Sequence, residues 1–342
     1  MPATVSAIVV SFGDPAATER AVASLLAQTE PPVEVLVVDN HPDRPTATAM
    51  AGWRFDDRVR LIHSGENLGY TTACNFAARQ ASGEWLFFLN PDARADPACL
   101  GMLMMEATES RVGAIGAQVL LPDERTNAGD NPLHVTGIAW AGRYGQTREH
   151  GPARRVASVS GAALLARTSA FRALGGLCER FFMYYDDTDF CWRLRLAGWD
   201  VVFCPEAVIW HDYEFEKGPR KWYWLERNRL WSVMSNYSAV TLVLLGPLLA
   251  GAEAMVAITA LRDGWGRSLM RAWGSLLPAV FEAGRWRAEV QRSRQAPDSE
   301  LLELMSGRFE TALVDSRAMR AVNPLTELYR RLVVLILRWG RR

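Results

Sequence analysis

The sequence predicts an α/β protein built on a doubly wound, mainly parallel sheet. In the first 90 residues, short apolar runs alternate with helical patterns, which is the order that such sheets require. A polar turn follows three of the apolar runs, at 11–14, 39–40 and 90–92. Because ligands of these sheets bind beyond the carboxyl ends of the strands, we expect functional side chains in these turns.

The individual elements follow from hydrophobic periodicity and turn residues. Helices are expected over 16–28 and about 70–81, and a further helix over 188–197 ends at Gly198, a C-cap residue. Residues 122–155 are rich in Gly, Pro, Asn and Arg and are predicted to be a mobile loop region. The expected strands are 5–11, 33–38, 59–62, 85–89, 160–166 after a tight glycine turn, and 201–204.

The composition is that of a globular protein. Its 342 residues are 49% hydrophobic and 22% charged, enough to bury a core in one large domain or two smaller ones. The net charge is zero, so no global feature indicates a nucleic-acid partner. The five cysteines form no CxxC pair, and the N-terminus lacks a basic region followed by an apolar core. We therefore expect reduced thiols, a cytosolic compartment and no signal peptide.

The C-terminal part has a different character. Residues 239–261 contain one charge, Glu253, and are long enough to span a membrane, although Gly246-Pro247 interrupts them. A transmembrane helix, an interfacial or re-entrant helix pair, and a buried core helix all remain open. Residues 262–342 carry 15 Arg against 9 Asp or Glu, and 328–342 mix Arg with Leu, Val, Ile and Trp. This composition indicates a region at a membrane surface.

Three carboxylates lie within four residues at a predicted helix start, at Asp186, Asp187 and Asp189. Capping of the helix amides explains one of them. Three repel one another, so a cation or a catalytic task would account for the excess. The helix dipole is expected to lower the pKa of such a carboxyl and weaken it as a base, although positioning against a hydroxyl can compensate.

Further polar residues follow other apolar runs. Asp39 can accept hydrogen bonds from a nucleobase or ribose, or simply form an Asx turn. Asn90 and Asp92 follow the run 85–89, where a carboxylate suits either a turn or a divalent cation shared with substrate phosphates. His211 is either structural or completes an oxygen-rich metal site.

Residues 221–231 combine aromatic and basic side chains. Helical spacing places Trp224, Arg227 and Trp231 on or near one face. Arg227 and Arg229 are candidates to pair with a diphosphate. The same composition suits a membrane interface, and both interpretations remain open.

Taken in order, these motifs resemble the family 2 glycosyltransferases, which are inverting enzymes of the GT-A fold that use nucleotide-diphosphate sugars. The resemblance rests on VSAIVVSFGD at 5–14, VVDN at 37–40, and the runs 66–93, 160–176, 180–211 and 226–231. The motifs are similar in style to bacterial rhamnosyl- and galactofuranosyltransferase-like enzymes of surface polysaccharide synthesis. Single motifs are weak signals, but the ordered set is specific.

The resemblance implies roles at the donor. Ser11 and Asp39 would lie at the nucleotide, and Asn67 and Gly69 would lie near the donor. Arg227, in the motif ERNRLW, would contact the diphosphate.

The resemblance also implies the reacting groups. Asp187 would be the general base, with Asp186 beside it orienting groups or the acceptor, and Asp189 would only cap or support the helix. Asp92 and His211 would hold Mn²⁺ or Mg²⁺ on the diphosphate.

The chain departs from the family pattern at two places. Asn90 replaces the first acidic residue of the metal-binding triplet, so ligation depends more on Asp92 and His211. SFGD stands where this branch often has a Tyr-Asn pair. The QxxRW motif of processive synthases is absent, which argues against a polymerising synthase.

The implied reaction moves a sugar from a UDP- or dTDP-sugar, with dTDP-rhamnose indicated by the branch, to a glycan or lipid-linked glycan. Residues 1–215 would form the GT-A catalytic domain. Residues 216–342 would form a helical, membrane-associating region at the cytoplasmic face of the cell membrane.

Two other classes remain as alternatives. A sugar-1-phosphate nucleotidyltransferase would need a glycine-rich phosphate loop, where this chain has SFGDPAAT with one glycine. A non-catalytic glycan-binding membrane protein would have no need to keep Asp92, Asp187 and His211 together.

Overall fold

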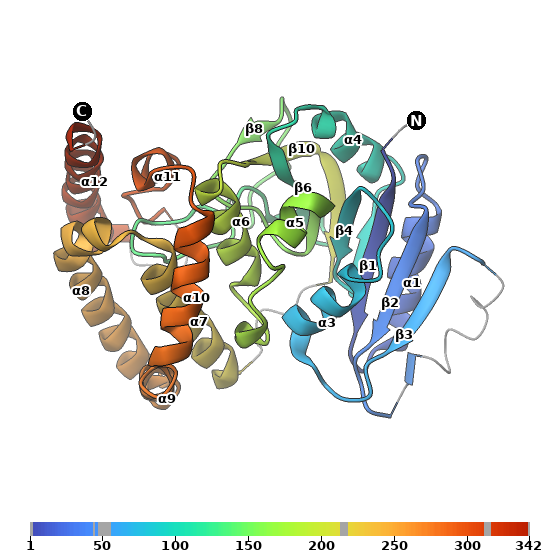
Figure 1. Ribbon diagram of the computed structural model, residues 1–342, viewed down its shortest axis with the longest axis horizontal. Helices are drawn as coiled ribbons and strands as arrows, with labels where there is room; N and C mark the ends of the chain where they lie inside the picture. The colour runs from blue at the N-terminus through green and yellow to red at the C-terminus, as the bar shows by residue number, and fades with distance from the viewer. Residues whose placement is uncertain (1–2, 44, 47–55, 213–217, 311–315, 341–342) are drawn as a thin grey trace. The chain divides into compact units, whose positions relative to one another are not determined.

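The computed structural model describes residues 3–43, 45–46, 56–212, 218–310 and 316–340 (Figure 1). The chain forms two compact units. Unit 1 comprises Met1–Asn131, Ala141–Leu194 and Trp199–Glu214, and unit 2 comprises Pro132–Trp140, Arg195–Gly198 and Phe215–Arg342.

The first part of unit 1 alternates strands and helices, as predicted. The strands Val5–Ser11, Glu34–Asp39 and Trp85–Leu89 are buried, whereas Val59–His63 is partly exposed. The first helix, α1, begins where the Asp14 carboxylate accepts a hydrogen bond from the Ala17 amide at 2.9 Å. The expected strands at 5–11 and 85–89 have these bounds, and the other elements differ by one to three residues at an end. The elements are β1 Val5–Ser11, α1 Pro15–Leu26, β2 Glu34–Asp39, β3 Val59–His63, α3 Gly69–Ala78 and β4 Trp85–Leu89.

The strands of unit 1 form one mixed sheet in the order β3-β2-β1-β4-β9-β6-β10-β5, with β7 paired to β6 and β8 to β10. β1 to β4 are parallel neighbours, β6 and β10 are parallel to each other, and β9 runs antiparallel between β4 and β6. The predicted α/β class is therefore confirmed. The remaining strands are β5 Ala93–Ala95, β6 Val112–Leu120, β7 Thr126–Ala128, β8 Arg154–Arg155, β9 Ala163–Arg167 and β10 Asp200–His211.

β10 is much longer than the strand expected at 201–204. A register shift between Cys204 and Val208 marks an irregularity around Pro205, after which the strand continues to His211. Proline in a strand is tolerated at such irregularities. The sequence pattern therefore ended the predicted strand before Pro205, whereas the actual strand continues past it. This extension brings His211 opposite Ala93 of β5.

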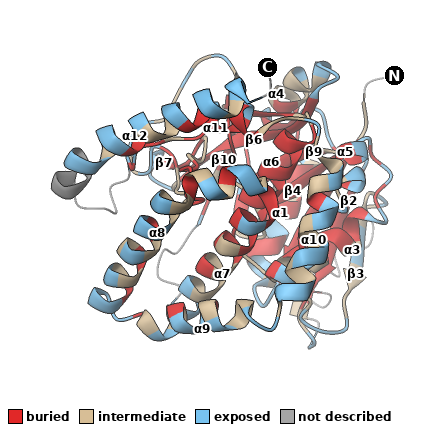
Figure 2. Ribbon diagram, turned by 60° about the vertical axis from the view of Figure 1, so that its left-hand side comes forward, coloured by how far each residue is buried: buried red, intermediate tan, exposed pale blue. Residues whose placement is uncertain are grey.

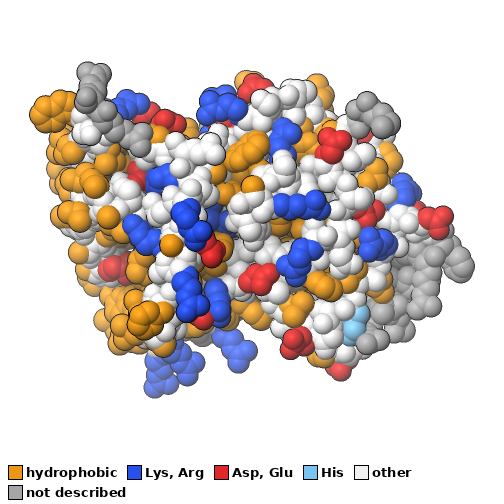
Figure 3. Space-filling view, in the orientation of Figure 1, with side chains coloured by type: hydrophobic (Ala, Val, Ile, Leu, Met, Phe, Trp, Pro, Cys, Tyr) orange, Lys and Arg blue, Asp and Glu red, His pale blue; other side chains and the backbone are white. Residues whose placement is uncertain are grey.

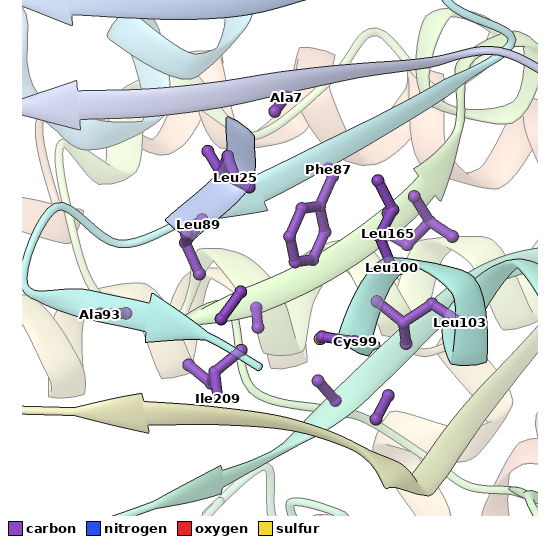
Figure 4. Packing of buried hydrophobic residues seen from close by; sticks show 14 of the residues in the cluster. Ala7, Leu25, Phe87, Leu89, Ala93, Cys99, Leu100, Leu103, Leu165 and Ile209 are labelled. Atoms are coloured by element: carbon purple, nitrogen blue, oxygen red, sulfur yellow. The ribbon is translucent and has the colours of Figure 1, made fainter. Parts of the chain in front are cut away.

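Helices cover both faces of the sheet, and its central strands are buried on both sides (Figure 2). On one face, Leu25 of α1 and Leu100 of α4 pack with Phe87 and Leu165 of the sheet (Figure 4). On the other face, α3, α5 and α6 pack against strand residues of opposite parity. The helical elements added here are α4 Cys99–Met105, η2 Glu106–Thr108, α5 Thr168–Ala173, η3 Glu179–Phe181 and α6 Asp186–Leu196.

The segment 122–155 is mostly irregular, as predicted, apart from β7 and β8. The prediction of a mobile loop missed that part of this segment is buried: Leu133, His134 and Val135 are fully buried. These three residues belong to unit 2, where the Tyr237 hydroxyl donates to the Val135 carbonyl at 2.8 Å. Such long-range burial has no local periodicity in the sequence.

Unit 2 is helical and contains a buried ionic network. Arg229 donates to the Glu226 carboxylate at 2.7 Å, to the Thr136 carbonyl at 3.0 Å and to Glu253. The Trp273 indole donates to the other oxygen of Glu253 at 3.2 Å. Arg229 is therefore held within unit 2, contrary to its suggested pairing with a diphosphate. The helices are α7 Pro219–Asn236, α8 Ala239–Arg262, α9 Gly266–Leu276, α10 Val280–Ser293, α11 Asp298–Leu304 and α12 Ser316–Trp339.

The apolar segment 239–261 forms one continuous helix, α8, with Pro247 inside it, so it is not a helix pair. Among the described residues, α8 alone is long and apolar enough to cross a membrane. Most of its side chains are not buried. The buried ones form a stripe of Thr241, Leu245, Ala252, Val256 and Ala260.

Candidate active site

The carboxyl ends of β1 and β2 place Ser11 beside Asp39 in the sheet register. Both side chains are fully buried. The Ser11 hydroxyl is hydrogen-bonded to the hydroxyls of Thr18 at 2.7 Å and Thr46 at 2.8 Å. The sequence therefore placed both residues at the correct edge of the sheet, and their role as nucleotide ligands remains a prediction.

Asn40, which follows Asp39, organises the turn before α3. Its amide oxygen accepts from the Leu68 amide at 3.0 Å, and its amide nitrogen donates to Asn67 Oδ1 at 3.3 Å and to the Gly69 carbonyl at 3.2 Å. Gly69 has a φ of 76°, a left-handed conformation that favours glycine. Asn67 and Gly69 thus lie together at the same edge of the sheet as Asp39.

The carboxyl ends of β4 and β10 bring together the predicted metal ligands. His211 Nε2 lies 3.0 Å from Asp92 Oδ1 and 3.3 Å from Asn90 Nδ2. The imidazole is almost buried, whereas the Asp92 side chain is 32% exposed. The sequence named all three residues, and the structure places them in contact.

The side chains of Asp92 and His211 fit the requirements of a divalent cation that would be shared with a substrate. Adjacent ligands of an octahedral ion with bonds of about 2.1 Å are about 3 Å apart, which matches the separation of Asp92 Oδ1 and His211 Nε2. Carboxylate and imidazole both ligate Mn²⁺. In the part of the chain that the structure describes, no group of three or more His, Cys, Asp or Glu gathers as in a protein-only metal site. The remaining ligands would therefore be phosphate oxygens and water.

The acidic cluster lies at the start of α6. Asp187 Oδ2 accepts from the Gly161 amide at 2.7 Å, and Oδ1 accepts from the Thr188 amide at 2.6 Å. Asp187 keeps some exposed surface, whereas Asp186 is buried. The two neighbouring carboxylates therefore have different environments, one accessible and one enclosed.

Burial decides the acidity of both groups. It raises the pKa of the Asp186 carboxyl from 3.8 to about 8, and the neighbouring charge of Asp187 adds to the rise. Burial also raises the pKa of Asp187, against the lowering effect of the Gly161 and Thr188 amides. The expected lowering by the helix start is thus outweighed by the loss of solvent. A carboxylate with a raised pKa is a better proton acceptor near neutral pH.

One turn joins the acidic cluster to the predicted metal ligands. The Gly161 amide donates to Asp187, and the next residue's carbonyl, that of Ala162, accepts from the Asn90 amide at 3.0 Å. A Cβ at Gly161 would lie 3.0 Å from the Cβ of Asp187, so a larger residue would crowd the carboxylate. Asp187 and Asn90 are therefore linked to each other through two consecutive residues.

The chain before Asp186 has an unusual backbone. Phe182, Tyr184 and Tyr185 all have φ between 63° and 66°. Such conformations cost about 1–3 kcal/mol each for residues other than glycine and persist where surrounding contacts impose them. The strain lies directly before the acidic cluster, a location typical of functional sites.

Asp189 has the supporting role expected from the sequence. Its carboxylate accepts from Arg193 Nε at 2.7 Å within α6, and both side chains are buried. Arg193 also donates to the carbonyls of Leu174 at 3.1 Å and Gly176 at 2.9 Å. This ion pair therefore ties α6 to the segment that precedes the acidic cluster.

Arg227 lies in unit 2, on α7. Its guanidinium carbon is 5.5 Å from the ring centre of Trp224 and 5.6 Å from that of Trp231, so the predicted shared face is confirmed. The Arg227 guanidinium also donates to Asn228 at 3.1 Å. Its predicted contact with the diphosphate is not tested by these interactions.

Sequence reasoning missed several residues around the site. Asn40 appeared only as part of a turn, and Gly161 only as a turn glycine. Phe12, directly after Ser11, presents a ring that is 54% exposed and lies 5.0 Å from the His41 ring. Tyr70 lies close enough to Asp186 for its charge to add to the burial that raises the Tyr70 pKa. Phe12 and Asn40 each directly follow a strand, and that position was the signal available in the sequence.

An α/β sheet with a carboxylate–histidine pair and a buried acidic cluster at its carboxyl edge is the arrangement expected of the GT-A type. The Glycosyl transferase family 2 profile matches residues 6–175. An N-acetylglucosaminyl-diphospho-decaprenol L-rhamnosyltransferase of Mycobacterium tuberculosis is 34% identical over 237 residues, 62% of this chain and 76% of that protein. The chain belongs to glycosyltransferase family 2.

Two further comparisons agree with this assignment. The O-antigen biosynthesis protein RfbC of Myxococcus xanthus is 33% identical over 236 residues, 64% of this chain and 18% of that protein. The solved structure of the mannosyltransferase PcManGT from Pyrobaculum calidifontis, in complex with GDP-Man and Mn²⁺, superimposes with a TM-score of 0.53 at 17% identity. That match covers 100% of this chain and 89% of the other, and it supports the GT-A fold.

Proposed function

We propose that this glycosyltransferase moves a sugar from a UDP- or dTDP-sugar to a lipid-linked glycan with inversion at the anomeric carbon. Asp187 is the general base, and Asp92 with His211 holds Mn²⁺ or Mg²⁺ on the diphosphate. Residues 1–215 form the catalytic domain, and residues 216–342 form a membrane-associating region. Family membership sets aside the nucleotidyltransferase and the non-catalytic binding protein.

The observation that carries this proposal is the turn at 160–162. It holds Asp187 through the Gly161 amide and Asn90 through the Ala162 carbonyl. A single displacement needs the base on the acceptor side and the charge-stabilising group on the leaving-group side of one anomeric carbon. The link between the two groups through residues 161 and 162 supports that arrangement.

In the proposed mechanism, Asp187 takes up the proton of the acceptor hydroxyl. The Gly161 and Thr188 amides orient the Asp187 carboxylate, whose raised pKa favours proton uptake. The acceptor hydroxyl gives its proton to Asp187 while its oxygen forms a bond to C1 of the donor sugar. The bond from C1 to the diphosphate oxygen breaks, and its electron pair leaves with the nucleotide diphosphate. A divalent cation, when bound, would stabilise the charge that develops on that leaving group.

Asp186 complements the base without replacing it. With a pKa raised to about 8, it keeps its proton near neutral pH and can donate a hydrogen bond that orients a neighbouring group. Its burial also limits access to an incoming hydroxyl. These properties support the assignment of Asp187 as the base.

The strand ends support the proposed nucleotide-sugar donor. Ser11, Asp39, Asn67 and Gly69 lie at the edge where nucleotides bind in open α/β sheets. The exposed Phe12 ring offers a flat surface to a base. The rhamnosyltransferase relative favours dTDP-rhamnose as the first donor to test.

Two observations support a lipid-linked acceptor. The rhamnosyltransferase relative is named for N-acetylglucosaminyl-diphospho-decaprenol, and unit 2 of this chain has an apolar surface. α8 and α12 lie side by side, and the Tyr329 hydroxyl donates to the Leu244 carbonyl at 2.6 Å. Figure 3 shows hydrophobic side chains gathered along their outer edge. We call this surface the apolar face, formed by Val240, Val243, Ile258, Leu261, Leu325, Leu328, Leu332, Leu335 and Trp339, each at least 50% exposed.

A lipid surface is the occupant that suits the apolar face. Exposed apolar stripes this extensive are rare on soluble monomers. Arg331 and Arg338 lie exposed on α12, and residues 262–342 carry a surplus of six positive charges (15 Arg minus 9 acidic residues). Basic residues beside an apolar helical face attract anionic headgroups. We infer binding at the cytoplasmic face of the cell membrane, where a lipid-linked acceptor is located.

Asp187→Asn tests the proposed chemistry. Transfer from a panel of UDP- and dTDP-sugars to a polyprenyl-diphosphate-linked N-acetylglucosamine would be measured with Mn²⁺, and the product anomer determined by NMR. The variant should lose about 10²–10⁴-fold in rate while nucleotide binding stays nearly intact. Transfer at the wild-type rate, or retention of the donor's anomeric configuration, would overturn the mechanism.

A further inference from the structure

The first turn of α3 is capped by a residue far away in the chain. The amides of Tyr70 and Thr71 both donate to the Phe182 carbonyl, at 2.6 and 3.2 Å. The N-cap residue Leu68 supplies no side-chain acceptor, so this carbonyl satisfies amides that a helix start leaves without intrahelical partners. A Cβ on Gly69 would lie 2.5 Å from the Phe182 ring and 2.7 Å from its carbonyl oxygen. The absence of a side chain at Gly69 therefore permits this contact.

A second point of attachment lies on the same helix. Asn75 donates to the Leu177 carbonyl at 2.8 Å and accepts from the Leu177 amide at 2.9 Å. It also donates to the Glu179 carboxylate at 3.1 Å. Asn75 is only 4% exposed, so these bonds form in a largely dry environment, where they are strong. A Cβ on Gly176 would lie 2.4 Å from Asn75 Oδ1, which shows how closely the backbone approaches.

The segment held in this way, residues 176–185, leads directly into the acidic cluster. It contains the three left-handed residues that precede Asp186. Local preference would not keep such a backbone, so external contacts must impose it. α3 supplies them at Leu177 and Phe182, while Arg193 of α6 holds Gly176 from the other side.

We propose that Asn75 is a positioning residue for the general base, acting through the segment 176–185. The same helix begins at the Asn67–Gly69 turn, which Asn40 ties to the strand end beside Asp39. α3 therefore connects the donor edge of the sheet to the carboxylate that takes the proton. The role of Asn67 and Gly69 is then partly to place this helix, in addition to any contact with the donor. The proposal rests on the assigned role of Asp187.

The chain offers a matched control for this residue. Asn323 of unit 2 accepts from the Phe309 amide at 2.9 Å and donates to the Phe309 carbonyl at 3.1 Å, which is the same two-bond pattern. Asn323→Ala removes a comparable pair of bonds outside the proposed catalytic machinery. Asn75→Ala removes all the bonds of Asn75. Asn75→Asp keeps the volume and the acceptor but sets a carboxylate against the Leu177 carbonyl and the Glu179 carboxylate.

The test compares the three variants in the full-length protein, at temperatures well below each melting point. Both Asn75 variants should lower kcat by about 10²-fold, as displacement of a catalytic group by about 1 Å can do. The affinity for UDP or dTDP should change by less than about twofold, because the binding contacts are unchanged. Asn323→Ala should lose stability without this fall in kcat. Hydrogen exchange should rise within 177–187 only in the Asn75 variants.

Equal kcat for Asn75→Asp and Asn323→Ala, or unchanged exchange within 177–187, would overturn the positioning role. A parallel loss of nucleotide affinity would assign Asn75 to donor binding and would also overturn it. Failure of the proposed function has a different signature. In that case Asp187→Asn would retain activity. Hydrogen exchange within 177–187 would still show whether Asn75 restrains this segment.

Discussion

Replacing Asp186 with Asn is expected to stabilise the protein at alkaline pH and to flatten its pH dependence. The folded state raises the pKa of this carboxyl from 3.8 to about 8. Between these values the folded protein keeps a proton that the unfolded chain loses, so stability falls as the pH rises through this window. Asn resembles the protonated carboxyl in shape and carries no charge to bury.

The size of the effect follows from the shift. One pKa unit corresponds to about 1.4 kcal/mol, so three pH units between pH 5 and pH 8 amount to about 4 kcal/mol at most. Part of the rise comes from the charge of Asp187, whose own pKa is also raised, so we take roughly half of this limit, about 2 kcal/mol, as the expected effect. For a domain of this size, that corresponds to a rise of about 4–8 °C in melting temperature.

Thermal melts of wild type and Asp186→Asn at pH 5 and pH 8, with a chelator and without donor, would measure this effect. The difference between the two proteins should be several degrees larger at pH 8. Asp57→Asn, at an exposed carboxylate, controls for the loss of one surface charge. A difference that is the same at both pH values would refute the argument that burial of Asp186 destabilises the folded state.

Three further outcomes are expected. Asp92→Asn and His211→Ala should each raise the Mn²⁺ concentration for half-maximal transfer at least about tenfold, and a wild-type Mn²⁺ titration curve would contradict their assignment as ligands. Arg229→Met leaves two glutamates of unit 2 without their shared cation, which should cost about 3–5 kcal/mol in a denaturant titration. An unchanged midpoint would show that solvent screens the network. Leu328→Glu combined with Leu332→Glu should abolish co-sedimentation with anionic vesicles while leaving transfer to a water-soluble acceptor intact. Retained vesicle binding would exclude the apolar face as the contact.

The elements that the sequence predicted well have strong local patterns. Val5–Ser11 is a mainly apolar, β-branched run and Trp85–Leu89 an uninterrupted apolar one, both followed by polar turns, and their bounds were correct. The strand after residue 200 was underestimated because Pro205 interrupts its pattern, whereas pairing with β5 and β6 carries the strand on to His211. Residues 133–137 were predicted to belong to a mobile loop region, because their burial depends on α7 and other distant segments of unit 2.

The candidate site also contains some residues that the sequence identified and others that it did not. Carboxylates at strand ends and at a helix start can be recognised from the sequence pattern, so Asp39, Asp92 and Asp187 could be named as candidate site residues from their positions. The residues that hold them, such as Asn40 and Asn75, have no comparable signal, because a buried asparagine acquires its partners only on folding.

Local pattern was therefore sufficient for the strand and helix order, the class of sheet and the identities of the acidic groups, since these depend on residues close together in the chain. Folding in three dimensions set the 3.0 Å pairing of Asp92 with His211, the turn at 160–162 and the raised pKa of Asp186. These features join residues that are 26 to 119 positions apart or depend on the exclusion of water. No pattern within a short window of sequence contains that information.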